Sequence, residues 1–174
     1  PYLATEDRRQ DFLYSKPIIE WHSKVYVRHD SGISYNTPSD LLGLTECLPH
    51  HYGGIEKLDE MFAIGEIRRV RPPHIKSCWL MILNGRADFF IEDILVADMF
   101  RGEVLGDRYS EIIELDNTVS IDHGYVIFPR SSLLSVSLLN KFNETLKELK
   151  QRGEIEKIKV LFRAHSSRVI EMVN

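Results

Sequence analysis

The chain has 174 residues, of which 43% are hydrophobic and 28% are charged, and its formal net charge is −4. This length and composition are typical of a soluble globular protein with one or two domains. The acidic balance argues against a nucleic-acid-binding face, which usually shows a basic excess. No apolar run approaches the ~18 residues that a membrane span needs.

The first half of the chain combines short β-rich segments, loops and one helix. Residues 16–28 are β-rich. Within them Val25 and Val27 alternate with Tyr26, which predicts a strand with one buried face. Residues 29–40 are rich in Gly, Pro, Asn, Asp and Ser and predict a loop. The pattern then predicts a strand over 44–48, a turn over 49–54 (PHHYGG), a helix over 55–63 and a strand over 66–70.

The stretch 84–100, NGRADFFIEDILVADMF, is the centre of the predicted fold. A largely buried helix over 75–83 precedes it, a short buried strand covers 89–91, and a second helix begins at residue 94. Glu92 and Asp93 therefore stand where a buried strand meets a helix N-terminus, at the crevice where open α/β sheets bind ligands. Asp93 is the leading candidate functional residue, although Asp is also a favoured N-cap and the local pattern alone favours capping.

Two further strands are predicted, over 111–115 and over 122–129. Strands alternate with helices from residue 44 to residue 115, which predicts a mainly parallel sheet that is covered on both faces. The β-rich segments 16–28 and 122–129 flank this block. We expect them to form a double crossing between two lobes.

The clearest helix covers Ser131–Arg152. Ser131 or Ser132 can provide its N-cap, and Gly153 suits the position just past its C-terminus. A shorter helix is expected over 154–164. One face of the long helix is apolar and consists of Leu134, Leu138, Phe142, Leu146 and Leu149.

The sequence shows no metal-binding or cofactor-binding motif. Cys47 and Cys78 lack zinc-ligand spacing, so they form either one disulfide or two buried thiols. A metal site built on Glu46, Cys47, His50, His51 and His74 would lack recognisable ligand spacing. No phosphate-binding loop or nucleophile constellation is visible either. We expect no cofactor.

The order of the segments TEDRRQDFLYS, KVYVRHDSG, GRADFFIED and YVIFPRSSLL…LKELKQRGEIEKI resembles the bacterial extracellular solute-binding proteins of the polar amino-acid uptake type, over about residues 2–162. The resemblance implies an α/β fold of the periplasmic-binding-protein-like type II, with two lobes joined by two crossing strands. Lobe two would cover 23–120, and lobe one 1–19 plus 123–174. In the family, lobe one begins with further strand–helix units, so we expect lobe one to be incomplete here by something like ~60 residues, because one βαβ unit takes ~30.

The resemblance also implies two ligand-binding residues. Arg8 stands seven residues before Ser15, as does the family's arginine that grips the ligand carboxylate, and a guanidinium can donate two parallel hydrogen bonds to a carboxylate. Asp93 stands seven residues after Arg86, as does the aspartate that receives the ligand's α-amino group. Asp88 is expected to be structural.

The chain departs from the family at two places. Leu3 replaces a usual hydroxyl residue, and the loop whose amides hold the carboxylate contains Pro49, His50 and His51. Proline removes one amide donor, while the histidines could add pH-sensitive donors. The aromatic residues Tyr14 and Trp21 could line the ligand site or belong to the hinge core.

We therefore expect a non-catalytic, periplasmic or otherwise extracytoplasmic protein that captures a small polar, amino-acid-like ligand for ABC-type uptake. Its partner would be an ABC permease or a sensor, not a nucleic acid, and the incomplete lobe one could form a homodimer. One alternative is a sensory or interaction domain with a degenerate pocket. Another is an enzyme on the same fold, related to periplasmic dehydratases or lytic transglycosylases.

Overall fold

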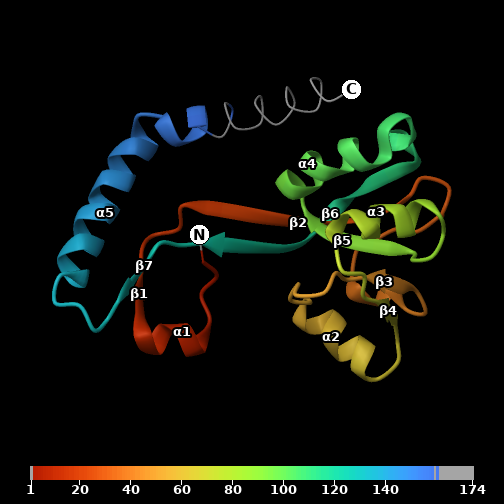
Figure 1. The fold of residues 1–174 in the computed structure, drawn as a ribbon, viewed down its shortest axis with the longest axis horizontal. Helices are drawn as coiled ribbons and strands as arrows, with labels where there is room; N and C mark the ends of the chain where they lie inside the picture. The colour runs from red at the N-terminus through yellow and green to blue at the C-terminus, as the bar shows by residue number, and fades with distance from the viewer. Residues whose placement is uncertain (1, 159, 161–174) are drawn as a thin grey trace. The chain divides into compact units, whose positions relative to one another are not determined.

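The computed structural model describes residues 2–158 and 160. The chain divides into two compact units: unit 1 is Pro1–Trp21 with Ile121–Asn174, and unit 2 is His22–Ser120. Two strands, β2 (Ile19–Arg28) and β6 (Ile112–Gly124), carry the chain from unit 1 into unit 2 and back (Figure 1). Within the described residues, no helix has the length and apolar character needed to cross a membrane.

A five-stranded mixed sheet organises unit 2, with strand order β4-β3-β5-β2-β6. Strand β3 (Thr45–Cys47) pairs in parallel with β4 (Arg68–Val70) and with β5 (Phe89–Asp93), whereas β2 pairs antiparallel with β5. The prediction of a parallel sheet is thus correct for β4, β3 and β5. Strand β2, which the sequence pattern placed outside this block as a crossing strand, runs antiparallel to β5.

Helices cover both faces of this sheet. Figure 1 shows α2 (Glu56–Ala63) on one side and α3 (Ile75–Leu83) and α4 (Ile94–Leu105) on the other. Val25 and Val27 pack with Leu58 of α2, while Tyr26 packs with Trp79 of α3. The prediction that β2 has one buried face is therefore wrong, because Tyr26 is as fully buried as the two valines.

The ends of several elements differ from the sequence pattern. Strand β6 is one 13-residue strand, where the pattern predicted separate strands over 111–115 and 122–129. The polar stretch between them hides its continuity, because an exposed strand does not require apolar residues. The short strand β7 (Ile127–Pro129) follows. Two 3-10 helices, η1 (Pro38–Leu41) and η2 (Gly106–Glu111), were not predicted.

Unit 1 contains α1 (Glu6–Asp11), β1 (Phe12–Tyr14) and α5 (Ser135–Gln151), and its sheet is the antiparallel pair β1–β7. The predicted serine cap of α5 is wrong, because its N-cap is Leu134 without a side-chain cap. The hydroxyl of Ser132 accepts from the Leu134 amide instead. Beyond the C-cap, Gly153 has a φ of +71°, the left-handed conformation that glycine favours there. Helix resumes over 154–158, and the predicted stretch 161–164 lies outside the described residues.

A disulfide between Cys47 and Cys78 joins β3 to α3. Both residues are fully buried in the cluster around Trp79, and their Cα atoms are 5.5 Å apart. The sequence left this pairing open. The bond lies inside unit 2 and links the sheet to one of the helices that cover it.

Candidate functional site

The carboxyl ends of the three parallel strands meet at one edge of the unit 2 sheet. Loop 48–55 follows β3, residues 71–74 follow β4, and Glu92 and Asp93 end β5. The His50 amide donates to the Pro72 carbonyl at 2.8 Å, so the first two loops are bonded to each other. Ligands of open α/β sheets bind at such an edge. We therefore take it as the candidate functional site.

Asp93 is a well-bonded helix cap. Its side chain is 7% exposed, and one carboxylate oxygen accepts from the Leu95 amide at 3.0 Å and the Val96 amide at 3.3 Å. The other oxygen accepts from the His22 amide at 2.8 Å. The structure thus shows the capping role that the local pattern favoured. An ionised carboxylate offers about four acceptor positions, so a ligand ammonium remains possible as a further donor.

Glu92 lies at the same edge, although the sequence pattern alone favoured Asp93 as the functional residue. It is 7% exposed, and its Oε1 accepts from the Asp93 amide at 2.9 Å, which turns its carboxylate toward the strand end. Its Oε2 is buried and has no hydrogen-bond partner within the described residues. Burial, assisted by the charge of Asp93, raises the pKa of Glu92 to about 7.

Loop 49–54 brings three exposed side chains to the same edge. The rings of His50 and His51 lie 6.3 Å apart, and His51 has a φ of +68°, which is uncommon outside glycine. Tyr52 is 41% exposed, and its pKa is raised by burial and, to a lesser degree, by the charge of Glu92. Loop 49–54 and the end of β5 are therefore within electrostatic reach of each other.

The N-terminus of α2 is acidic, which makes it a poor seat for a ligand carboxylate. Its N-cap Ile55 makes no side-chain capping bond, and Glu56 and Asp59 stand in the first turn. A Cβ atom at Gly54 would lie 2.1 Å from Asp59 Oδ1, so a side chain at this position would displace the Asp59 carboxylate. Asp59 also accepts from Arg69 at 2.6 Å. Negative side chains in this turn already use the favourable end of the helix dipole.

The remaining predicted residues belong to unit 1. Arg8 lies exposed on α1, donates from Nη1 to the Leu3 carbonyl at 3.2 Å, and stands 5.8 Å from the centre of the Tyr2 ring. The ring of Tyr14 meets Tyr125 edge-on at 5.6 Å, and its buried hydroxyl has no hydrogen-bond partner within the described residues. Trp21 is partly buried in β2. The roles of these residues toward a ligand stay predictions.

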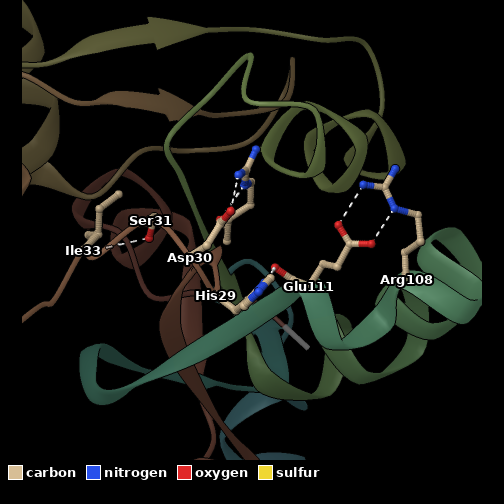
Figure 2. A network of polar contacts seen from close by, with 7 residues as sticks. His29, Asp30, Ser31, Ile33, Arg108 and Glu111 are labelled. Carbon is tan, nitrogen blue, oxygen red and sulfur yellow. Dashed lines mark hydrogen bonds and ion pairs between the residues drawn. The ribbon is translucent and has the colours of Figure 1, made fainter.

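Two other charged clusters are structural. In the first, shown in Figure 2, Arg108 donates to both carboxylate oxygens of Glu111 at 2.6 and 2.7 Å, and His29 Nδ1 stands 3.3 Å from the Glu111 carbonyl. Arg28 lowers the pKa of Asp30 in the same cluster, and Arg108 lowers that of Glu111. The two exposed carboxylates of this cluster are each paired with an arginine, so neither offers a free charge to a ligand.

The second cluster is buried, and it includes Glu46, one of the candidate ligands of the hypothetical metal site. Glu46 accepts from Arg69 at 2.7 Å with both side chains almost fully buried, and Cys47 is in the disulfide. Neither is available as a metal ligand. Within the described part of the chain, no three His, Cys, Asp or Glu side chains are grouped so that they could hold a metal ion.

No protein-family model and no curated relative matches the chain. Solved structures do match. The holo form of ArgBP from T. maritima is 22% identical over 92% of this chain, with a TM-score of 0.64. The probable amino-acid ABC transporter extracellular-binding protein YtmK from Bacillus subtilis is 16% identical over 91%, with a TM-score of 0.73. A histidine kinase sensor domain with similarity to periplasmic binding proteins is 20% identical over 91%, with a TM-score of 0.67.

The chain has a periplasmic-binding-protein-like fold. This confirms the α/β fold of this type that the sequence resemblance implied. The chain spans 66% of the ArgBP structure, 67% of YtmK and 65% of the kinase sensor domain. It thus covers about two thirds of each of these proteins.

Proposed function

We propose that this protein binds a small polar, amino-acid-like ligand and catalyses nothing. The observation that carries the proposal is the pair of buried carboxylates, Glu92 and Asp93, at the carboxyl edge of the unit 2 sheet. A cationic group is the natural partner of such a pair. Two proteins with similar folds support the same ligand class. One is ArgBP, and the other is YtmK, which is named as a probable amino-acid ABC transporter extracellular-binding protein.

In this proposal Asp93 receives the ligand's amino group and Arg8 its carboxylate. The guanidinium of Arg8 is exposed and suited to bidentate recognition. His50 and His51 add donors from loop 49–54, and Tyr14 and Trp21 provide aromatic contacts. No catalytic residue and no cofactor are part of the proposal.

The disulfide supports an extracytoplasmic location for this activity. Such bonds persist in oxidising compartments and are rare in the cytosol. A protein that works there could deliver its ligand to an ABC permease. The similarity to a histidine kinase sensor domain favours a second candidate function, in which ligand binding is reported to a sensor partner.

A thermal-shift screen against the common amino acids and small carboxylates tests the proposal. A ligand at ~100 times its dissociation constant stabilises the folded protein by roughly 2.7 kcal/mol. The screen should be repeated on Asp93→Asn, because Asn is also a good N-cap and the substitution removes the charge while keeping the cap. Arg8→Ala is paired with Arg9→Ala as its matched control.

We expect a clear shift in the wild type and in Arg9→Ala, and its loss in Asp93→Asn and Arg8→Ala. A ligand that stabilises all four proteins equally would refute the assigned residues. No shift with any compound from a folded wild type would refute solute binding of this class.

A further inference from the structure

The Oε2 atom of Glu92 is an unmet acceptor at the candidate site. Buried carboxylate oxygens are nearly always hydrogen-bonded, and leaving one without a donor is costly. Glu92 is 7% exposed, yet its bond to the Asp93 amide uses only Oε1. Oε2 is covered and has no partner within residues 2–158 and 160. A group in this state needs a donor from outside the described residues.

The neighbouring cation does not supply this donor. Lys24 stands directly opposite Glu92 in the β2–β5 register, but its Nζ bonds to the Asp116 carbonyl and lies 4.0 Å from Glu114. Tyr26, the next residue on the same face, donates its hydroxyl to Glu114 at 2.9 Å. The Asp93 carboxylate has the same charge sign as Glu92 and cannot donate a hydrogen bond to it. Within the described residues, the strand end therefore holds two carboxylates, and no cation donates a hydrogen bond to Glu92 Oε2.

We propose that Glu92 determines ligand specificity, because its Oε2 accepts a hydrogen bond from a second cationic group of the ligand. This inference rests on the proposed function. A neutral amino acid brings one ammonium, which Asp93 would receive, and so leaves Glu92 unmatched. A basic amino acid, with an amine or guanidinium on its side chain, brings the second group. The ligand class is therefore a basic amino acid.

Access to Oε2 requires movement of a neighbouring side chain, and loop 49–54 is the element placed to move. Tyr52 lies at the surface and within the electrostatic range of Glu92. His51 next to it holds a backbone conformation that L-residues rarely adopt. We assign to a rearrangement of this loop the opening that admits a ligand to Glu92.

Calorimetric titration with matched ligands tests the inference. Arginine is compared with citrulline, its neutral isostere, and lysine with norleucine. The proteins are the wild type, Glu92→Gln, and the control Glu111→Gln, which removes the same charge from the exposed cluster of Figure 2. We expect the wild type and the control to prefer the charged ligand of each pair at least about tenfold, the size of a charge-assisted hydrogen bond. Glu92→Gln should lose this preference while still binding the neutral ligands.

The other possible results distinguish failure of this inference from failure of the proposed function. If the wild type binds neutral amino acids as tightly as basic ones, this inference is wrong and the proposed function stands. The same holds if Glu92→Gln keeps the full preference. The comparison within the wild type decides the matter even if the variant fails to fold. If the wild type binds none of the four ligands and no other amino acid, the proposed function fails, and this inference fails with it.

Discussion

The buried carboxyl of Glu92 couples the stability of unit 2 to pH. Its pKa in the folded chain is about 7, against an ordinary value near 4.5, so between these values the folded chain holds a proton that the unfolded chain has lost. Unfolding then releases a proton, and raising the pH favours unfolding. This single group should lower the free energy of unfolding by roughly 3 kcal/mol as the pH rises from about 4.5 to about 8, with no further change above.

Urea denaturation at several pH values checks this prediction. Glu92→Gln cannot ionise, so its stability relative to the wild type should rise between about pH 5 and about pH 8 and then stay level. Glu111→Gln should not show this rise, because Arg108 lowers the pKa of that exposed carboxyl instead of raising it. Parallel curves for the wild type and Glu92→Gln would show that the Glu92 carboxyl ionises normally.

Individual residues differ in whether their structural roles could be predicted from the sequence. The position of Asp93 at the end of a buried strand was predictable, because strand, cap and helix follow one another in the chain. The missing partner of Glu92 Oε2 was not predictable. It depends on Lys24 bonding to residues of β6, which are far away in the sequence. Tyr26 was misassigned for a related reason: alternation indicates one buried face only when the other face is open to water.

At the level of elements, the disulfide between β3 and α3 should make a large contribution to stability. It closes a loop with a sequence separation of 31 residues. Chain-entropy arguments give about 3–4 kcal/mol for a loop of this size. We expect a reducing agent to lower the free energy of unfolding of the wild type by this order. The double variant Cys47→Ala/Cys78→Ala should start from the lower value and show no response to the reductant. A wild type that is equally stable in both conditions would contradict this.

The helices and strands differ in how well the sequence predicted them. The cores of α2, α3 and α4 follow from apolar spacing. Helices α2 and α3 begin and end close to the predicted residues, and α4 begins at the predicted residue 94. The middle of β6 is polar and exposed, so nothing in its local pattern marked it as strand. The start of α5 was misjudged because two serines offered a cap that the chain does not use.

Over the whole molecule, α5 presents an apolar surface that we expect to pair with a second copy of the chain. The exposed residues at its N-terminal end include Leu133 at 101%, Leu134 at 66% and Leu138 at 51%. They belong to a unit whose sheet is the two-stranded β1–β7 pair, which is marginally stable without further packing. Apolar surface of this kind favours association.

Light scattering after size exclusion, at micromolar concentration, measures this association. The 174-residue chain should elute as a dimer, and Leu134→Lys/Leu138→Lys should shift it to a monomer. Ile64→Lys is the matched control, since Ile64 is 73% exposed but belongs to unit 2. A monomeric wild type, or a dimer that both variants leave intact, would argue against this surface.

The two strands that carry the chain into and out of unit 2 bear on whether this unit can be inserted into another protein. β2 and β6 are hydrogen-bonded neighbours in one sheet, so residues 22–120 leave unit 1 and return to it along adjacent strands. We therefore expect this segment to tolerate insertion into a single loop of another protein, because its two ends lie on neighbouring strands. Transplanted in this way, it would take Glu92, Asp93 and loop 49–54 with it as one piece.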